Sequence, residues 1–425
     1  MNYTKFGPRC RGYSAIIFSM TILIKNIGEL ATPVGAGKQS GAMQNDCVKR
    51  MKNAYILIDG SKIIEVGEGE SPSADEVIDV KGALVTPGLV DPHTHLVFGG
   101  YREKELAMKL KGMDYLAIHN AGGGINSTVK ATREASADEL YAKASEHLDF
   151  MLANGVTSVE IKTGYGLDTE NEVKMLQVIK KLKANHKVDI AITFMPLHSL
   201  PDDFEGSTSD YVKYAIDEML PAVIDEGGAE FIDVFCEKDI FTAEECKQVL
   251  EAGKAAGLIP KCHTNEIERI GGVEMATSIG SISMEHLIVA NSEDIAVMKN
   301  FDTIACLLPA TSFYLGSTYA LAREMIDNNV AVAFGSDFNP GSCPNNNFVL
   351  AMNIGCLKYK MTPEESLCAA TLNAAAAINR AKDFGSIEVG KQADILIWDA
   401  NNLDYIFYRF GQNLVSRVIK SGEKI

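Results

Sequence analysis

Five histidines and one aspartate fall at the ends of apolar, strand-like runs of this sequence. They are His93 and His95 in DPHTHL, His198, His263, His286 and Asp337. Residues two apart in a strand face the same side, so the imidazoles of His93 and His95 can bind one metal ion. An H-x-H pair alone is a weak signal, and the other strand-end groups strengthen it. The remaining histidines lie in helical or loop segments and are expected to be structural or solvent-exposed: His119, His147 and His186.

A cluster of neutral imidazoles with a carboxylate is typical of Zn²⁺ or Fe²⁺ sites, whereas Mg²⁺ and Ca²⁺ prefer oxygen ligands. Such an ion lowers the pKa of a bound water from near 16 towards about 7 and supplies hydroxide at neutral pH. An acid–base group must then move protons, and Glu266 in HTNE and Asp337 are the candidates. The set indicates metal-dependent hydrolysis, and the alternative is that these histidines are separate core or surface residues.

The elements that must position these groups are eight apolar runs, most of them followed by a helical pattern such as ENEVKMLQVIKKLKA. Eight strand–helix units predict an α/β fold, a closed (β/α)8 barrel with its active groups at the carboxyl ends of the strands. An open, doubly wound sheet is the alternative. The runs are GALVTPGLVDPHTHL, VTSVEIKTGYG, DIAITFMPLHS, AEFIDVFCE, LIPKCHTNE, SISMEHL, DTIACLLP and VAVAFGSDF.

Short β-rich runs also occur at both ends of the chain, for example TILIKNI and AYILIDG near the start and ADILIWDA near the end. Neither end alone has enough strands for a stable sheet. We therefore predict a small β-sandwich domain built from residues 20–85 and 386–425, with the barrel over 86–385. Residues 1–19 are basic with a short apolar patch, and we expect a disordered leader before Met20.

The formal charge of −16, with no run of Lys or Arg, argues against nucleic acid and anionic membrane surfaces as partners. An anionic substrate would be repelled by the protein as a whole, so a carboxylate substrate requires a local arginine. Nine cysteines without a C-x-x-C spacing indicate reduced thiols in a cytoplasmic protein. A disulfide framework is the less favoured alternative.

Several longer stretches show which family of metal-dependent hydrolases the sequence resembles. They are DPHTHLVFGGYRE, IKTGYGLDTENE, DVFCEKDIFT, ACLLPATSFYL and GSDFNPGSCP. From about Met20 to the C-terminus the chain resembles the imidazolonepropionases of the amidohydrolase superfamily. The resemblance implies hydrolysis of the ring amide of 4-imidazolone-5-propanoate to N-formimidoyl-L-glutamate in histidine degradation. It also implies one Zn²⁺ or Fe²⁺/Fe³⁺ per subunit and a homodimer.

The resemblance assigns the metal ligands as His93, His95, His263 and Asp337. Binuclear relatives bridge two metals with a carboxylated lysine at the end of strand four. Here that strand ends with Cys236 and Glu237, which agrees with a single metal ion.

The resemblance also implies a substrate pocket. Arg102 in GGYRE would hold the propionate, because a planar guanidinium binds a carboxylate with two hydrogen bonds. Spacing alone favours a surface ion pair for Arg102. The other expected substrate contacts are Tyr165, His198, Glu266, Asn339, Gly341 and Ser342.

The expected mechanism uses three residues as catalytic groups. Glu266 orients substrate and nucleophile, His286 polarises the ring carbonyl or assists proton removal, and Asp337 passes a proton to the leaving nitrogen. The division of work between Glu266 and His286 stays open. One departure from the family pattern HADE is visible, because Thr264 and Asn265 stand between His263 and Glu266.

Two rival functions remain. Another cyclic amidohydrolase or a nucleobase deaminase can use the same barrel, but a nucleobase has no carboxylate for Arg102 to bind. A catalytically silent barrel that serves as a binding module would be favoured by loss of metal ligands, and every expected ligand is present.

Overall fold

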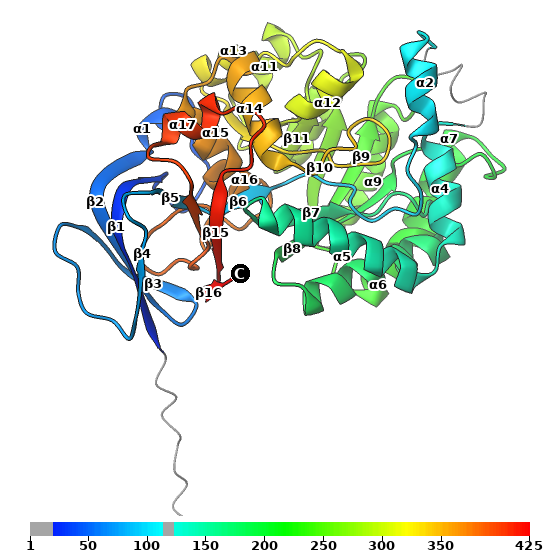
Figure 1. Cartoon of the computed structure of the whole chain (residues 1–425). Helices are drawn as coiled ribbons and strands as arrows, with labels where there is room; N and C mark the ends of the chain where they lie inside the picture. The colour runs from blue at the N-terminus through cyan, green and yellow to red at the C-terminus, as the bar shows by residue number, and fades with distance from the viewer. Residues whose placement is uncertain (1–19, 114–122) are drawn as a thin grey trace, which may run out of the picture.

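The computed structural model describes residues 20–113 and 123–425. The predicted leader and His119 lie outside the described residues. The strands form two eight-stranded sheets, which Figure 1 shows side by side, with the terminal strands in blue and red beside the larger, mostly green and yellow part.

The first sheet is parallel, and its strands follow one another in chain order. Each of the eight predicted runs contains one of its strands. The second, VTSVEIK, is buried at every position, as expected for a parallel sheet covered on both faces. The strands are β6 (Leu89–Asp91), β7 (Val156–Lys162), β8 (Asp189–Leu197), β9 (Phe231–Cys236), β10 (Ile259–Thr264), β11 (Ser283–His286), β12 (Ile304–Leu307) and β13 (Ala331–Phe334).

The segments that follow β6 and β13 bring the two edges of this sheet together. Thr94 forms a parallel bridge with Phe338. The amide of Asp337 donates to the carbonyl of His93 at 3.0 Å, and the amide of His95 donates to the carbonyl of Phe338 at 2.9 Å. The predicted barrel is therefore confirmed, and the closing hydrogen bonds come from the residues expected to bind metal.

Helices cover the outside of the barrel between successive strands (Figure 1). Their starts follow local rules: α5 and α9 begin with capping boxes, Ser136 with Glu139 and Thr242 with Glu245. The helices are α2 (Lys104–Leu110), α4 (Ile125–Glu134), α5 (Ala137–Ala153), α6 (Thr169–Asn185), α7 (Thr208–Tyr214), the π-helical turn η1 (Ala215–Met219), α8 (Leu220–Glu226), α9 (Ala243–Ala255), α10 (Gly272–Ile279), α11 (Ser292–Met298), α12 (Pro309–Leu315), α13 (Ala322–Asp327), α14 (Phe348–Tyr359), α15 (Pro363–Ala370) and α16 (Leu372–Ala377).

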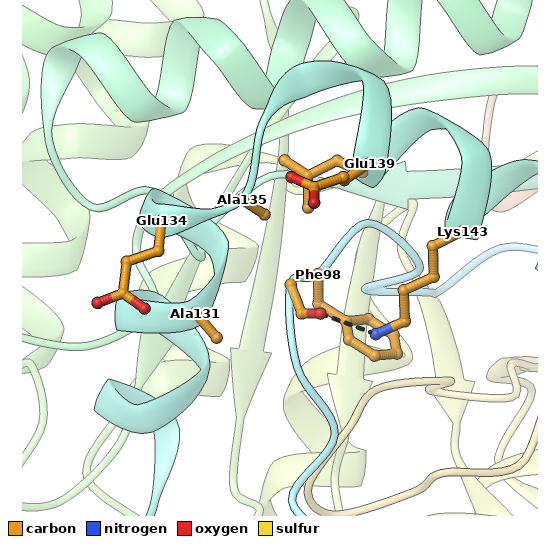
Figure 2. A pocket seen from close by; sticks show the side chains of 8 residues that line it. Phe98, Ala131, Glu134, Ala135, Glu139 and Lys143 are labelled. Carbon is orange, nitrogen blue, oxygen red and sulfur yellow. Dashed lines mark hydrogen bonds between the residues drawn. The ribbon is translucent and has the colours of Figure 1, made fainter.

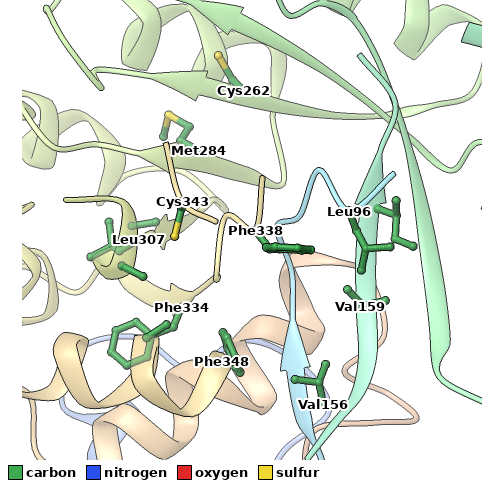
Figure 3. Close-up of a cluster of buried hydrophobic side chains, with 14 of the residues drawn as sticks. Leu96, Val156, Val159, Cys262, Met284, Leu307, Phe334, Phe338, Cys343 and Phe348 are labelled. Carbon is green, nitrogen blue, oxygen red and sulfur yellow. The ribbon is translucent and has the colours of Figure 1, made fainter. Parts of the chain in front are cut away.

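Apolar side chains fill the space between the strands and these helices. Figure 3 shows Phe334 of β13 beside Phe348 of α14, with Val156 and Val159 of β7 across the view. All four side chains are fully buried. Truncating a buried Phe to Ala costs about 3–5 kcal/mol, so this layer fixes the strands that carry the site.

The second sheet is mixed and combines both ends of the chain. The long strand β1 pairs with β4 in its first half, through Ile22–Lys25, and with β5 near Leu30. Strand β14 then pairs with β5 and joins the C-terminal strands to the N-terminal ones. The elements are β1 (Thr21–Thr32), β2 (Lys49–Asp59), β3 (Lys62–Glu68), β4 (Glu76–Asp79), β5 (Leu84–Pro87), β14 (Ile395–Trp398), β15 (Val415–Lys420) and β16 (Glu423–Lys424), with α1 (Met43–Asp46) and α17 (Leu403–Tyr408).

The predicted fold class, a barrel with a β unit made from both termini, is confirmed, and the terminal strands belong to one continuous sheet. Within the described ranges, none of the helices combines the length and the apolar character that a membrane span requires. The eight cysteines found there are free thiols, including Cys47 and Cys368, whose sulfur atoms lie 3.8 Å apart.

Candidate metal and substrate site

The carboxyl ends of the barrel strands bring together the predicted metal-binding side chains. The Nε2 atoms of His95 and His263 are 3.3 Å apart. Oδ1 of Asp337 lies 3.4 Å from Nε2 of His93 and 3.7 Å from Nε2 of His95. His93, His95 and Asp337 form one compact group of donor atoms, and a second such group joins His93 and His263 to His286.

These separations match the size of a metal ion. A tetrahedral ion with metal–nitrogen bonds of about 2.0–2.1 Å holds neighbouring ligand atoms about 3.3–3.4 Å apart. The Nε2 atom of His93 is buried and has no hydrogen-bond partner, an arrangement that a metal bond would satisfy. The residues present therefore fit the ion that this donor set predicts.

The histidines are held in their neutral form. Burial is the main cause that lowers the pKa of His93, His95 and His286 well below its ordinary value. Metal binding requires a neutral imidazole. The site can therefore take up an ion near neutral pH without first removing protons from these side chains.

Two carboxylates that the sequence analysis did not single out stand behind the metal-facing histidines. Glu285 Oε2 lies 3.0 Å from Nδ1 of His93, and Asp233 Oδ2 lies 3.0 Å from Nδ1 of His263. Such partners fix the tautomer and the ring orientation of a metal-binding histidine. An available signal was the presence of a charged residue inside an otherwise apolar strand, as in FIDVF and SMEH.

Two side chains of the site stand on strained backbone. Asp337 has φ 53° and His286 has φ 70°. Residues other than glycine rarely adopt positive φ, and such residues cluster at functional sites. Thr311 Oγ1 donates a 2.7 Å hydrogen bond to Oδ2 of Asp337, which leaves Oδ1 directed at the histidines.

Glu266 and His286, two of the predicted catalytic residues, are neighbours. Their Oε2 and Nε2 atoms are 3.5 Å apart, and both side chains are largely buried. Burial, helped by the charges of Asp337 and Glu237, raises the pKa of Glu266 to about 8. The Glu237 carboxylate accepts hydrogen bonds from three successive amides, of which the first is that of Glu266, so it holds the backbone that carries Glu266.

Thr264 and Asn265, the two residues that depart from the family pattern, direct their polar side-chain atoms at each other and at Asp294. Asn265 has φ 54°, a conformation that asparagine tolerates better than most residues. Its side-chain amide donates to Oδ2 of Asp294 at 3.3 Å, and the hydroxyl of Thr264 donates to Oδ1 of Asn265 at 3.2 Å. Thr264 and Asn265 therefore build the turn between His263 and Glu266.

Arg102 is held in a fixed position beside the barrel mouth. Its Nε and Nη2 atoms donate to the two oxygens of Glu105 at 2.8 and 3.0 Å. A Cβ atom at Gly341 would lie only 2.2 Å from Nη1 of Arg102, so a side chain at this position would displace the guanidinium. Lys109 donates a 3.0 Å hydrogen bond to the carbonyl of Gly341 and adds a second positive charge.

Asn339 uses its side chain to build the turn after Asp337. Its Oδ1 accepts hydrogen bonds from the amides of Gly341 and Ser342 at 2.9 and 2.7 Å, and its Nδ2 donates to Oγ of Ser342 at 2.9 Å. These contacts place Gly341 against Arg102. Asn339 therefore shapes the site through its neighbours.

His198 and Tyr165 form an aromatic wall next to His95. The rings of His95 and His198 stack with centroids 4.6 Å apart, and the Tyr165 ring is 5.1 Å from that of His198. Nδ1 of His198 lies 2.9 Å from the carbonyl of Gly164. Burial, followed by the neighbouring His263, lowers the pKa of His198 to about 3, so its Nε2 is a hydrogen-bond acceptor at neutral pH.

Two surface pockets lie outside this cluster. One, of about 320 Å³, lies between α4, α5 and the chain after β6. Figure 2 shows the Lys143 side chain beside the Phe98 ring. Nζ of Lys143 donates a 3.1 Å hydrogen bond to the carbonyl of Gly99. The other, of about 270 Å³, is lined by Arg102 and Glu105. The first lacks the histidine cluster, whereas the second adjoins the predicted carboxylate-binding arginine.

Comparison with known proteins agrees with this geometry. The sequence model of the Amidohydrolase family matches residues 84–425. The chain is 48% identical over 412 residues to the imidazolonepropionase of Alkaliphilus metalliredigens strain QYMF, covering 95% of this chain and 97% of that protein. It is 46% identical over 413 residues to the imidazolonepropionase of Alkaliphilus oremlandii strain OhILAs, covering 95% and 98%.

Among solved structures, the atrazine chlorohydrolase of Arthrobacter aurescens TC1, crystallised with zinc, has a TM-score of 0.68 at 18% identity and covers 95% of this chain and 94% of its own. At that identity the likeness shows the shared fold alone. The near-full-length sequence matches carry more weight. Together they establish that this chain belongs to the amidohydrolase family and, within it, to the imidazolonepropionases.

Proposed function

We propose that this chain is a hydrolase that opens the ring of 4-imidazolone-5-propanoate, giving N-formimidoyl-L-glutamate in histidine degradation. The single observation that carries the proposal is near-full-length identity of 45–48% to relatives named imidazolonepropionase. The juxtaposition of a histidine–aspartate cluster with a fixed arginine supports it.

We further propose that one Zn²⁺ or Fe²⁺/Fe³⁺ ion binds each subunit through His93, His95, His263 and Asp337. The separations of 3.3–3.7 Å between neighbouring donor atoms support this set. When bound, the ion supplies a hydroxide nucleophile at neutral pH. The backing of two ligands by Glu285 and Asp233 supports a preference for an ion with imidazole ligands.

The protein's own residues hold the substrate and move its protons. Glu266 and His286 lie 3.5 Å apart, so they can exchange a proton and act as one acid–base pair beside the scissile amide. Their backbone is fixed by Glu237 and by strand β11. Asp337 lies at Nε2 of His93 and Glu285 at Nδ1, which supports Asp337 as the group that protonates the leaving ring nitrogen.

The carboxylate of the substrate is bound by Arg102. Arg102 donates to Glu105 through Nε and Nη2, so its Nη1 is not used in that contact. Lys109, which donates to the carbonyl of Gly341, adds positive charge beside the guanidinium. Gly341 and Ser342 then line the same corner, while His198 and Tyr165 cover the ring face. Asn339 then acts on the substrate only through its neighbours, because its side-chain oxygen already accepts hydrogen bonds from the amides of Gly341 and Ser342.

Three features of the assembled protein stay predictions: a homodimer, a cytoplasmic location, and the domain boundaries 20–85 with 386–425 and 86–385. The change of sheet between β5, which ends at Pro87, and β6, which begins at Leu89, supports a boundary close to residue 86.

Substrate discrimination tests the proposal against its nearest rival. The purified protein is offered imidazolone propionate, the imidazolone ring without its propionate, and a set of nucleobases. We expect ring opening of the first substrate, a loss of at least 100-fold in kcat/KM for the second, and no deamination. Deamination of a nucleobase, or equal turnover of the two imidazolones, would instead favour another amidohydrolase activity on this barrel.

A further inference from the structure

A line of five buried charged side chains crosses the barrel interior beneath the histidines. In order along the line they are Glu285, Lys261, Glu160, Lys162 and Asp233, and none has measurable exposure. Acidic and basic groups alternate strictly. They come from strands β11, β10, β7 and β9, so the line depends on the closed barrel and on the register of its strands.

Each step of the line is a close contact. Lys261 Nζ lies 3.5 Å from Oε1 of Glu285 and 3.3 Å from Oε1 of Glu160. Lys162 Nζ lies 2.6 Å from the same oxygen of Glu160 and 2.8 Å from Oδ2 of Asp233. One carboxylate oxygen therefore joins the two lysines at the centre.

The two ends of the line are the carboxylates that back the histidines. Oε2 of Glu285 lies 3.0 Å from Nδ1 of His93. Oδ2 of Asp233, the atom that Lys162 contacts, lies 3.0 Å from Nδ1 of His263. The line thus connects two of the proposed metal ligands from behind.

The lysines also hold the backbone of the H-x-H strand end. Lys261 Nζ donates a 3.0 Å hydrogen bond to the carbonyl of Pro92, the residue before His93. The amide of Lys162 donates to the carbonyl of Thr94, between His93 and His95, at 3.0 Å. The side chain of Lys261 therefore holds the backbone just before His93 and also contacts Glu285, the carboxylate behind the His93 ring.

Burying five ionisable groups is expensive, because each isolated ion loses several kcal/mol of hydration. Replacing buried ion pairs by well-packed apolar residues of similar volume is often neutral or stabilising. In the line, each end carboxylate instead contacts a lysine of opposite charge, Asp233 with Lys162 and Glu285 with Lys261. Although burial alone lowers the pKa of Lys162, the charges of Asp233, Glu160 and Glu285 outweigh it and raise that pKa, so the lysine stays positive.

We propose that Lys162, Lys261 and Glu160 are positioning residues of the metal centre: they keep Asp233 and Glu285 aligned on Nδ1 of His263 and His93, which leaves each Nε2 free for the metal. This inference rests on the proposed metal site. It goes beyond the ligand set, because it assigns a function to three residues that touch neither substrate nor metal.

The test is the affinity of the metal-free protein for Zn²⁺, measured by competition with a chromogenic chelator, together with the visible absorption spectrum after Co²⁺ is added. We expect Lys261→Met and Glu160→Gln to weaken Zn²⁺ binding by about 10-fold, in the range found for residues that orient metal ligands. The Co²⁺ spectrum should change as well, because the imidazole geometry is altered.

Lys420→Met is the matched control. Lys420 forms a buried pair with Asp394, at 2.6 Å, in the other sheet. Its replacement should lower thermal stability without changing the affinity for Zn²⁺ or the Co²⁺ spectrum.

Ser283→Ala is the mild variant in case the charge substitutions do not fold. Ser283 Oγ donates to Oε1 of Glu285 at 2.5 Å, and its loss should weaken Zn²⁺ binding by about 3-fold, the effect of one hydrogen bond. If every folded variant in the line binds Zn²⁺ and Co²⁺ as the unmodified protein does, the positioning role is wrong. If the unmodified protein binds neither ion, the metal proposal itself is overturned, and this inference falls with it.

Discussion

Nε2 of His286 and Oε2 of Glu266 are 3.5 Å apart at the mouth of the barrel, on the ends of two adjacent parallel strands. The sequence places both residues at strand ends, but it does not reveal this contact. A pair at this distance can share a proton and act as one unit. This contact explains why separate roles for Glu266 and His286 are hard to assign from residue types.

Replacing Glu266 by Gln removes the acid–base group and keeps its shape. We expect kcat to fall by about 10²–10⁴-fold, the usual contribution of such a group, with metal content unchanged. Glu268→Gln is the control, since the Glu268 side chain is half exposed and pairs with Lys238. Steady-state kinetics distinguish a catalytic role of Glu266 from a role in substrate binding alone. If Glu266→Gln kept the full kcat and only raised KM, Glu266 would be a binding residue only.

Replacing Arg102 by Lys keeps the positive charge but removes the planar fork that is held by Glu105. We expect KM for imidazolone propionate to rise about 10–100-fold, because hydrogen bonds to charged groups contribute about 1.5–3 kcal/mol. The value of kcat should stay within a few-fold. Arg323→Lys is the control, because this arginine pairs with Asp327 and with both oxygens of Glu365, and it should leave both kinetic constants unchanged. An unaltered KM in Arg102→Lys would remove Arg102 from the substrate site.

Metal binding should raise the melting temperature of the unmodified protein. Zn²⁺ at 100 times its Kd adds about 2.7 kcal/mol to the free energy of unfolding. His95→Ala should lose most of this response, whereas His186→Ala should keep it, because His186 pairs with Asp149 away from the cluster. Thermal unfolding with and without Zn²⁺ measures the effect, and an undiminished response in His95→Ala would exclude His95 as a ligand.

His147 gives a pH dependence that is independent of the metal. Burial, with a smaller effect of Lys143, lowers its pKa from 6.5 to about 4, although a hydrogen bond to Leu96 opposes the change. Between these pH values the unfolded chain binds a proton that the folded chain does not. Stability should therefore fall as the pH is lowered from about 6.5 to 4, by at most about 3 kcal/mol from this group.

His147→Phe should reduce that fall, as measured by urea unfolding at pH 7 and pH 5. The substitution also removes a 2.7 Å hydrogen bond to Tyr101, so the comparison concerns the slope with pH and not the absolute stability. An equal slope in both proteins would mean that His147 is already protonated in the fold or does not control acid stability.

Much of the fold follows from local pattern. The continuous apolar strands and the intervening helices indicate a parallel barrel. The short β runs at the two ends of the chain indicate one shared sheet, because neither end alone has enough strands for a stable sheet. The proposed metal ligands could be listed because strand ends in a barrel share one face. The pairing of β1 with both β4 and β5 could not be predicted, because it depends on a break in the strand near Asn26, which has φ 55°.

The contacts that hold the metal-site histidines and Arg102 in place could not be predicted from the sequence either, because they also depend on how the strands pair. Whether Asp233 and Glu285 point at His263 and His93 depends on the register between neighbouring strands, which the sequence does not state. The bidentate contact of Arg102 with Glu105 likewise depends on how the chain turns into α2. A charged residue inside an apolar strand indicates a position of this kind. Its partner is identified only when the strands are assembled into the closed barrel.

The most direct test of the account is turnover of freshly prepared imidazolone propionate, with metal content measured on the same sample. We predict ring opening that disappears when the metal is removed by a chelator and returns in proportion to added Zn²⁺ or Fe²⁺, up to one ion per subunit. Full turnover by metal-free protein, or bound metal with an untouched imidazolone, would contradict it.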